Sequence, residues 1–210
     1  ESGALQTAGK PSTWQKIDSD WYFYDEDGLK TVGKKNINGS TYYFNQEGVM
    51  QTGWAFVDGH WNYFASSGAM KTGWLKDNES WYYLNPETGI MVVGSKEIDG
   101  KNYFFSSAGT MQVGWQWSND SWHYYAMSGA VQTGWLKDGD AWYYLEGKEG
   151  VMLVGLHQVD GKQYYFSKSG VMQTGWKWFD NHYRYFESNG SMKTGWIKDK
   201  GVWYYLNPED

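Results

Sequence analysis

The residues of this chain that could do chemistry are tryptophans that recur in pairs, seven residues apart. The pairs are Trp54 and Trp61, Trp74 and Trp81, Trp115 and Trp122, Trp135 and Trp142, and Trp196 and Trp203, with Trp14 and Trp21 opening the series. The face of an aromatic ring attracts a cation, and a quaternary ammonium, which cannot donate hydrogen bonds, is held best by such faces. The pairs therefore predict binding of a cationic ligand.

The pairs belong to an internal repeat of about twenty residues that reads Gly-Trp, polar turn, Trp-Tyr-Tyr and Gly-x-Met-x-Thr. The repeats begin at Thr13, Gly33, Gly53, Gly73, Gly94, Gly114, Gly134, Gly155, Gly175 and Gly195. Such a period predicts a quasi-linear array in which each unit contacts mainly its neighbours. We assign residues 1–12 to the tail of a preceding repeat with its connector and residues 13–210 to the array, whose last unit is truncated. Both ends are therefore expected to cut through repeats of a longer protein.

Each repeat has the pattern of a β-hairpin, so the predicted fold class is all-β. A stretch such as Trp74-Leu75-Lys76 leads through a polar turn to Trp81-Tyr82-Tyr83-Leu84, which is aromatic strand chemistry. Asn-Gly and Asp-Gly pairs favour type I′ hairpin turns because both central residues need positive φ. These pairs are Asn38-Gly39, Asp58-Gly59, Asp99-Gly100, Asp138-Gly139 and Asp160-Gly161.

Side-chain alternation along the second strand assigns the rings to faces, because residues two apart share a face. The first and third positions, such as Trp61 and Tyr63, point together, whereas the middle position tolerates Asn62, His123 and Arg184 and is predicted to face water. The fourth position is always apolar and is predicted to pack between repeats. Its residues are Phe44, Phe64, Leu84, Phe105, Tyr125, Leu145, Phe166, Phe186 and Leu206.

Composition excludes several classes of function. The formal net charge of −6 argues against nucleic acid, whose recognition normally begins with Lys and Arg neutralising phosphates. No stretch approaches the ~20 apolar residues of a membrane span. Cysteine is absent, and the four histidines fall at scattered repeat positions without acidic partners at metal spacing, so they are predicted to be solvated. No catalytic motif, metal site or cofactor site is found, and the chain is not expected to be an enzyme.

The repeat resembles the choline-binding repeats of streptococcal cell-surface proteins, cell-wall hydrolases and their phages. Gly73-Trp74-Leu75-Lys76-Asp77 followed by Trp81-Tyr82-Tyr83-Leu84-Asn85 carries this resemblance, which covers nearly all of residues 13–210. It implies a left-handed β-solenoid of stacked hairpins, about three per turn. It also implies that choline lies between consecutive hairpins, enclosed by both tryptophans of one repeat, a strand tyrosine of the next and often a methionine.

Carried over residue by residue, the resemblance implies six choline-binding cages. They comprise Trp14, Trp21 and Tyr43; Trp54, Trp61 and Tyr83; Trp74, Trp81 and Phe104; Trp115, Trp122 and Tyr144; Trp135, Trp142 and Tyr165; and Trp176, Tyr183 and Tyr205. Within the repeats that carry these cages, the methionine position holds Met70, Met91, Met152 and Met192. Lys30 holds that position in the first such repeat and Val131 in another, so these two cages depart from the family pattern.

Three repeats depart further, because they lack both tryptophans. Lys34, Ser95 and Leu156 replace the first one, and Thr41, Asn102 and Gln163 the second. These repeats recur every 61 residues. With three repeats per turn, as in the family, they would stack on one side of the solenoid. We expect two flanks to bind choline and the third to lack cages.

The resemblance predicts a secreted, non-catalytic module that attaches a bacterial surface protein, such as an adhesin, to choline or phosphocholine on teichoic and lipoteichoic acids. One alternative is a carbohydrate-binding repeat, because glucan-binding and clostridial toxin repeats share the Asp-Gly turn and Tyr-Tyr-Phe strand of residues 160–166. The other alternative is the targeting region of a cell-wall hydrolase whose catalytic domain lies outside this chain. Self-association is left open.

Overall fold

The structure, a computed structural model, describes residues 10–208, and all regular secondary structure in that range is β. Most of the prediction for residues 1–12 therefore lies outside the described residues. The strands are β1 (Thr13–Ile17), β2 (Asp20–Tyr24), β3 (Gly33–Ile37), β4 (Ser40–Phe44), β5 (Gly53–Val57), β6 (His60–Phe64), β7 (Gly73–Asp77), β8 (Ser80–Leu84), β9 (Gly94–Ile98), β10 (Lys101–Phe105), β11 (Gly114–Ser118), β12 (Ser121–Tyr125), β13 (Gly134–Asp138), β14 (Ala141–Glu146), β15 (Val151–Met152), β16 (Gly155–Val159), β17 (Lys162–Phe166), β18 (Gly175–Phe179), β19 (His182–Phe186), β20 (Gly195–Asp199) and β21 (Val202–Leu206).

Consecutive strands form antiparallel hairpins, and the first strand of each hairpin begins at the residue where the sequence starts a repeat. In the hairpin of β5 and β6, Gly53 lies opposite Phe64, Trp54 opposite Tyr63 and Val57 opposite His60. Only β15 adds a third strand, to the hairpin of β13 and β14, among the described sheets. This register puts the Gly-Trp indole and the third-position ring of its own hairpin on one face.

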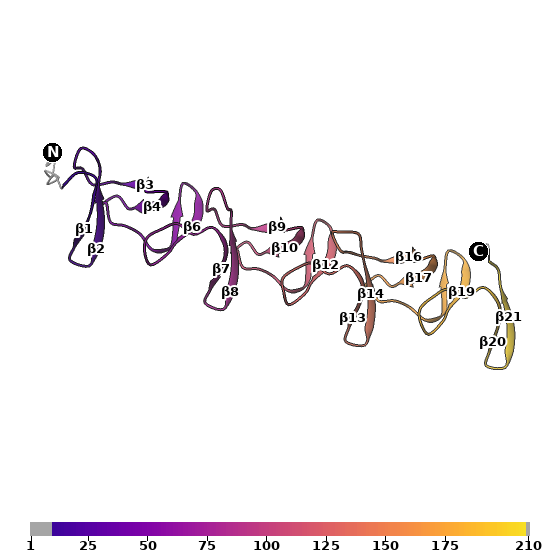
Figure 1. Cartoon of the computed structure of the whole chain (residues 1–210). Coiled ribbons are helices and arrows are strands. Elements are labelled where there is room, and N and C mark those ends of the chain that lie inside the picture. Colours follow the sequence, from indigo (N-terminus) through magenta and orange to yellow (C-terminus); the bar gives the residue numbers. More distant parts are fainter. Residues whose placement is uncertain (1–9, 209–210) are drawn as a thin grey trace. The chain divides into compact units, whose positions relative to one another are not determined.

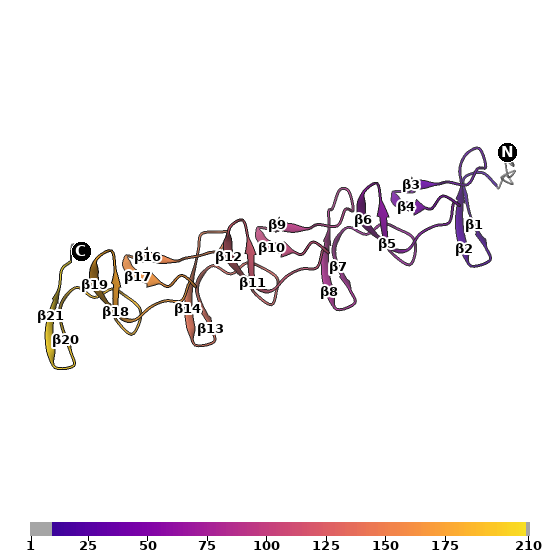
Figure 2. The ribbon, with the colours of Figure 1, turned by 180° about the vertical axis from the view of Figure 1, so that it is seen from behind.

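The chain divides into two compact units, one of residues 1–96 with 105–111 and the other of residues 97–104 with 112–210. Within the first unit, the hairpin of β7 and β8 points in the same direction as that of β1 and β2, three repeats earlier (Figure 1). Within the second unit, the hairpins β11–β12 and β18–β19 are likewise three repeats apart and point the same way (Figure 2). Hairpin direction therefore recurs every third repeat inside each unit.

Four of the five predicted Asn-Gly and Asp-Gly turns have positive φ at both central residues, as type I′ turns require. Asn38 and Gly39 have φ of 51° and 84°, for example. The prediction for Asp138-Gly139 is wrong by one residue, because Asp138 is the last residue of β13. The turn centre is Gly139-Asp140, in which Gly139 has φ of 58° and Asp140 is not in the positive region. Glycine in the first central position is typical of a type II′ turn.

The connectors bond to the hairpin one repeat before the hairpin that they follow. In the first unit, Met50, which follows β4, donates its backbone N–H to the carbonyl of Trp21 in β2 at 2.8 Å. In the second, Met172, which follows β17, donates to the carbonyl of Trp142 in β14 at 2.7 Å. These bonds satisfy backbone groups at the edge of the earlier hairpin and join neighbouring repeats without a continuous sheet.

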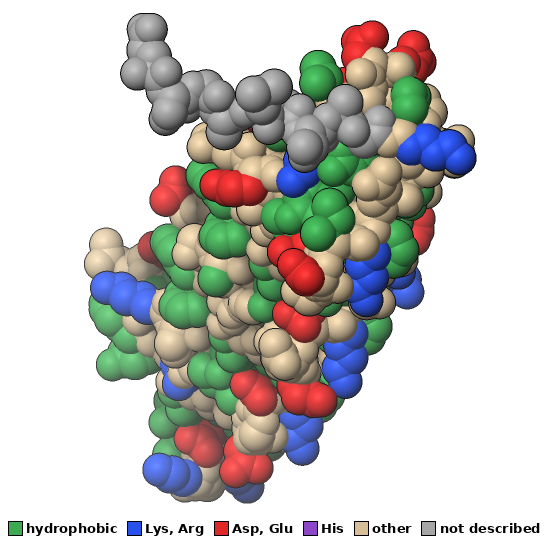
Figure 3. All heavy atoms as spheres, turned by 90° about the vertical axis from the view of Figure 1, so that its left-hand side faces the viewer, with side chains coloured by type: hydrophobic (Ala, Val, Ile, Leu, Met, Phe, Trp, Pro, Cys, Tyr) green, Lys and Arg blue, Asp and Glu red, His purple; other side chains and the backbone are tan. Residues whose placement is uncertain are grey.

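The core is a series of small clusters, each filled by the fourth position of a second strand. Phe44, Phe64, Leu84, Phe105, Phe166 and Phe186 are fully buried, and Tyr125 and Leu145 nearly so, which confirms their predicted packing role. Leu206 is only half-buried. Many other hydrophobic side chains reach the surface among acidic and basic ones (Figure 3). A single hairpin is too thin to enclose its rings, so burial depends on its neighbours.

The predicted exposure of the middle position is wrong. Asn62 is 0% and His123 5% exposed, so this position shares the inward face with the fully buried fourth position. The alternation rule had placed these two positions on one face, and the buried fourth position decides which face points inward. The prediction of solvated histidines fails at His123 for the same reason.

Replacing Phe166 by Ala should lower the free energy of unfolding by about 3–5 kcal/mol, because it empties the cluster of Phe166, Leu153 and Val159. The same replacement at Phe56, which is 59% exposed, should cost less than about 1 kcal/mol. Urea denaturation followed by tryptophan fluorescence would compare the two variants. Equal losses would contradict the assignment of the fourth position to the core.

Candidate aromatic ligand cages

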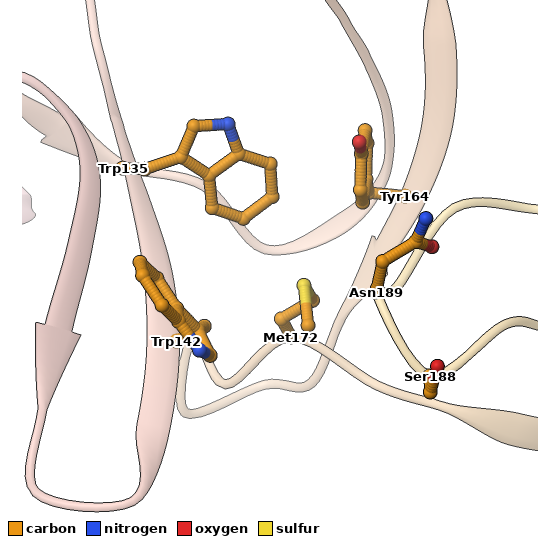
Figure 4. A pocket seen from close by; sticks show the side chains of 6 residues that line it. All are labelled: Trp135, Trp142, Tyr164, Met172, Ser188 and Asn189. Atoms are coloured by element: carbon orange, nitrogen blue, oxygen red, sulfur yellow. The ribbon is translucent and has the colours of Figure 1, made fainter.

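The two tryptophans of one repeat open onto a cavity that the next two repeats complete. In the second unit, a cavity of about 400 Å³ is lined by Trp135, Trp142, Tyr164, Met172, Ser188 and Asn189. The two indoles stand nearly perpendicular, with centroids 6.3 Å apart at 82°, and Tyr164 lies 4.9 Å from Trp135 at 69°. Figure 4 shows these rings around the open space, with the Met172 thioether at its floor and the polar side chains at one side.

The same constellation recurs in both units. Trp14, Trp21, Tyr42, Met50, Ser66 and Ser67 line a cavity of about 370 Å³ in the first unit. Trp115, Trp122, Tyr143, Met152 and Ser169 line one of about 280 Å³ in the second. Each set takes its tryptophans from one repeat, its tyrosine and methionine from the next, and its serine from the repeat after that. A cage therefore needs three consecutive repeats.

The chemistry of these cavities suits a compact cation without hydrogen-bond donors. Their lining side chains are indole and phenol rings, a thioether, hydroxyls and one amide, and none of these groups is charged. Ring faces attract a cation through their quadrupole, and a methionine can fill an irregular gap beside it. The cavities offer no paired acid and base for proton transfer.

The tyrosine assigned to each cage is wrong by one position. The ring that reaches the preceding Gly-Trp indole is Tyr42 rather than Tyr43, and Tyr82 rather than Tyr83. Later in the chain, Tyr143 and Tyr164 replace Tyr144 and Tyr165. At the last cage Tyr204 contacts Trp176, while the predicted Tyr205 lines a pocket with Tyr183.

The predicted rings have other partners. Tyr83, Tyr144 and Tyr205 pack on the Gly-Trp indole of their own hairpin at 5.1 to 5.3 Å. Tyr43 stacks on Phe64, Phe104 on Tyr125, and Tyr165 on Phe179. The physical reason is the register, which places the third position across from its own tryptophan and leaves the middle position to face the preceding repeat.

The methionine assignment is shifted by one repeat. The sequence paired each cage with the methionine of its own repeat, whereas the connector of the following repeat supplies it. Met50 and Met172 line cages and were missed, and Met152 lies in the cage of Trp115 rather than that of Trp135. Met91 donates its backbone N–H to the carbonyl of Trp61, which places it with the cage before its own.

Met70 and Met192 bond to repeats that lack the tryptophan pair, although Met192 also lines a pocket with Tyr183 and Tyr205, as the sequence assigned it. Their backbone N–H groups bond to the carbonyls of Thr41 and Gln163, in repeats that lack the pair. The other expected pairs keep their geometry: Trp74 with Trp81 at 6.1 Å, and Trp176 with Tyr183 at 6.4 Å. Trp54 lies 4.8 Å from Tyr82.

The repeats without tryptophans are followed by a polar side chain where the cages have tyrosine. Asn62, His123 and Arg184 occupy that middle position and are 61 residues apart. His123 bridges the carbonyls of Glu149 (2.8 Å) and Ser118 (3.2 Å), and Arg184 donates to the carbonyl of Phe179. Both tryptophans of one repeat and the tyrosine of the next repeat are thus replaced together. The shared 61-residue period could have revealed this linkage from the sequence.

Comparisons with known proteins agree with this geometry. The family described as the choline-binding repeat matches residues 31–72, 52–95, 92–131, 113–155 and 173–210, and a cell wall binding repeat matches 12–29 and 155–172. CbpJ from Streptococcus pneumoniae TIGR4 is similar, with 30% identity and a TM-score of 0.77 over 95% of this chain and 87% of its own. No curated protein matches the chain.

Two further solved structures share the fold. CbpF, solved in complex with ipratropium, is 31% identical with a TM-score of 0.72 over 83% of this chain and 63% of its own. The modular autolysin LytC from Streptococcus pneumoniae is 26% identical with a TM-score of 0.69 over 93% of this chain. The chain spans only 47% of LytC. The predicted fold class, an all-β solenoid of repeated hairpins, is thereby confirmed.

Residues 10–208 were predicted to contain neither a metal site nor a membrane span. Within that range no group of three or more His, Asp or Glu side chains is arranged to hold a metal ion. No helix in the same range has the length and apolar character needed to cross a membrane.

Replacing Tyr164 by Ala should weaken choline binding at the Trp135 cage at least threefold, because one of three ring walls is lost. Replacing Tyr165 should leave that cage's affinity within twofold and lower the stability instead, because Tyr165 stacks on Phe179 at 4.4 Å. Titration followed by tryptophan fluorescence, together with urea denaturation, would separate these effects. Loss of binding only in the Tyr165 variant would restore the original assignment.

Gly190 lies directly against the Met172 side chain of the same cage. It has φ of 84°, and a Cβ at this position would overlap the Met172 side chain. Replacing Gly190 by Ala should cost about 1–2 kcal/mol of stability and push Met172 into the cavity, which weakens choline binding there. Gly161, whose Cβ would meet open space, is the matched control for the backbone strain alone. Equal choline affinities in the two variants would contradict a role for Met172.

Proposed function

Because the chain belongs to the family of choline-binding repeats, we propose that it anchors its parent protein to a bacterial wall through the choline groups of teichoic and lipoteichoic acids. The observation that carries this proposal is the recurrence of one cage geometry in both units. Repeated cages suit a ligand that is itself repeated along a polymer. Family membership supports association with the cell surface, and secretion of the parent protein is part of the proposal.

The energetics explain why one cage is insufficient. Each ring contributes on the order of 0.5 to 2 kcal/mol to holding a quaternary ammonium. Three rings, less the entropy lost on binding, give a site in about the millimolar range. Several such sites on one chain, facing a polymer with many choline groups, raise the overall affinity through effective concentration.

We propose that the module itself is non-catalytic. The cages offer ring faces and hydroxyls, which bind and orient a cation but do not activate a nucleophile. Any reaction of the parent protein would then belong to residues outside this chain, as in a cell-wall hydrolase that carries a targeting region. The similarity to the modular autolysin LytC supports this arrangement for one class of parent.

The test is isothermal titration of the chain with choline and, separately, with isomaltose. We expect millimolar choline binding at several sites and no saturable sugar binding. A variant with Trp135→Ala and Trp142→Ala should lose one site, because both indoles of that cage are gone. Changing Met127 to Ala should leave the number of sites unchanged, because this side chain is 87% exposed and lies outside the described cavities. Saturable sugar binding without choline binding would favour the carbohydrate-binding alternative.

Attachment to the polymer needs a second measurement. The chain should sediment with walls that carry phosphocholine-bearing teichoic acid, and free choline should release it. Walls from which choline has been removed are the control. Equal retention on both kinds of wall would contradict recognition through choline, even if free choline binds in solution.

A further inference from the structure

The cages fall into two chemical classes that the ring pattern alone does not distinguish. In three of them the Gly-Trp indole donates its Nε1–H to a carboxylate of the next repeat. The bonds join Trp54 to Asp77 at 2.9 Å, Trp115 to Asp138 at 2.9 Å, and Trp176 to Asp199 at 3.0 Å. We name these the carboxylate cages. They recur every 61 residues, in repeats that begin at Gly53, Gly114 and Gly175.

In the other class the equivalent position is aliphatic. Ile37 follows the cage of Trp14, and Val159 follows that of Trp135, and both side chains are buried in the core. We name these two the aliphatic cages. Neither Ile37 nor Val159 carries a side-chain acceptor, so the chemical difference between the classes is one carboxylate per cage.

The carboxylate is not needed to set the ring geometry. Trp115 lies 4.8 Å from Tyr143 at 60°, and in the aliphatic class Trp135 lies 4.9 Å from Tyr164 at 69°. Trp14 and Tyr42 are likewise 4.8 Å apart. Since the aliphatic cages reach the same arrangement of tryptophan and tyrosine without the hydrogen bond, what the carboxylate adds to this ring pair is mainly its charge.

Among the described residues, no ion pair joins Asp77, Asp138 or Asp199 to a lysine or arginine. A carboxylate bonded to the indole N–H makes the ring face more negative, and it also attracts a cation directly. Both effects act in the same direction on a quaternary ammonium in the cage.

We propose that Asp77, Asp138 and Asp199 determine specificity by giving the carboxylate cages the higher affinity for a quaternary ammonium. This inference rests on the proposed function, because it ranks the cages for the same ligand. The carboxylate cages fill first as the choline concentration rises, and the aliphatic cages fill later. The three aspartates are positioning residues that act on the ligand through the indole and through their charge.

The test uses the whole chain labelled with nitrogen-15, in which each indole N–H gives its own signal. The signals of Trp115 and Trp135 report one cage of each class. The ligands are choline and dimethylbutanol, the neutral isostere in which carbon replaces the quaternary nitrogen. The variant Asp138→Asn removes the charge and keeps an acceptor for the indole. Asp160→Asn, in a turn next to an aliphatic cage, is the control with the same change of charge.

In the unmodified chain, choline should shift the Trp115 signal at lower concentration than the Trp135 signal. Asp138→Asn should weaken choline binding at Trp115 about three- to tenfold, with dimethylbutanol binding there and choline binding at Trp135 changed less than twofold. Asp160→Asn should change neither site. Unchanged choline affinity at Trp115 in the Asp138 variant would overturn the inference, and so would equal losses for choline and dimethylbutanol, which would indicate a structural role.

Failure of the proposed function gives a different result. If choline shifts neither the Trp115 nor the Trp135 signal in the unmodified chain, both the proposed function and this inference fail. If both signals shift at the same choline concentration and Asp138→Asn has no effect, only the ranking of the cages fails.

Discussion

A hairpin of two five-residue strands cannot bury its own aromatic side chains, and this constraint governs the rest of the structure. Burial requires the neighbouring hairpins, so the fourth-position side chains are enclosed by them, and connectors such as those of Met50 and Met172 bond to the hairpin one repeat before the one they follow. The cages follow from the same stacking. Where one hairpin meets the next, two indoles of the first face a tyrosine of the second, and the space between them is large enough for a small cation.

Three kinds of contact between consecutive hairpins recur with the 61-residue period. In the first kind a carboxylate accepts a hydrogen bond from the Gly-Trp indole, and in the second an aliphatic side chain takes the place of the carboxylate. In the third kind a polar side chain takes the place of the cage tyrosine. The first two keep the same ring geometry with different electrostatics. In the third, the His123 ring and one terminal nitrogen of the Arg184 guanidinium bond to backbone carbonyls where a ring would otherwise stand. Weak sites of different affinity on one chain still act together on a polymer and raise the overall affinity.

Much of the fold and part of the cages could be predicted from the amino-acid sequence. The repeat starts, the hairpins, four turns and the buried fourth position follow from strand alternation and turn chemistry, which are local. The tryptophan pairs were also correct, because both members belong to one hairpin and their spacing fixes their shared face. The cage tyrosine was assigned to the correct repeat but one position too far along the strand, because strand alternation does not say which face meets a neighbour. The methionine was assigned to the same repeat as the tryptophans, whereas the next repeat supplies it.

The sequence by itself therefore determined the all-β repeat, its period and the aromatic pairs, because each depends on contacts within about twenty residues. Only the tertiary structure decided that Tyr164 rather than Tyr165 faces Trp135, and that Met172 completes that cage. It also decided that Asp138 accepts a hydrogen bond from Trp115 rather than forming the centre of a turn. These three outcomes share one reason: the angle and offset between stacked hairpins select the facing side chain, and that geometry is set by packing between repeats.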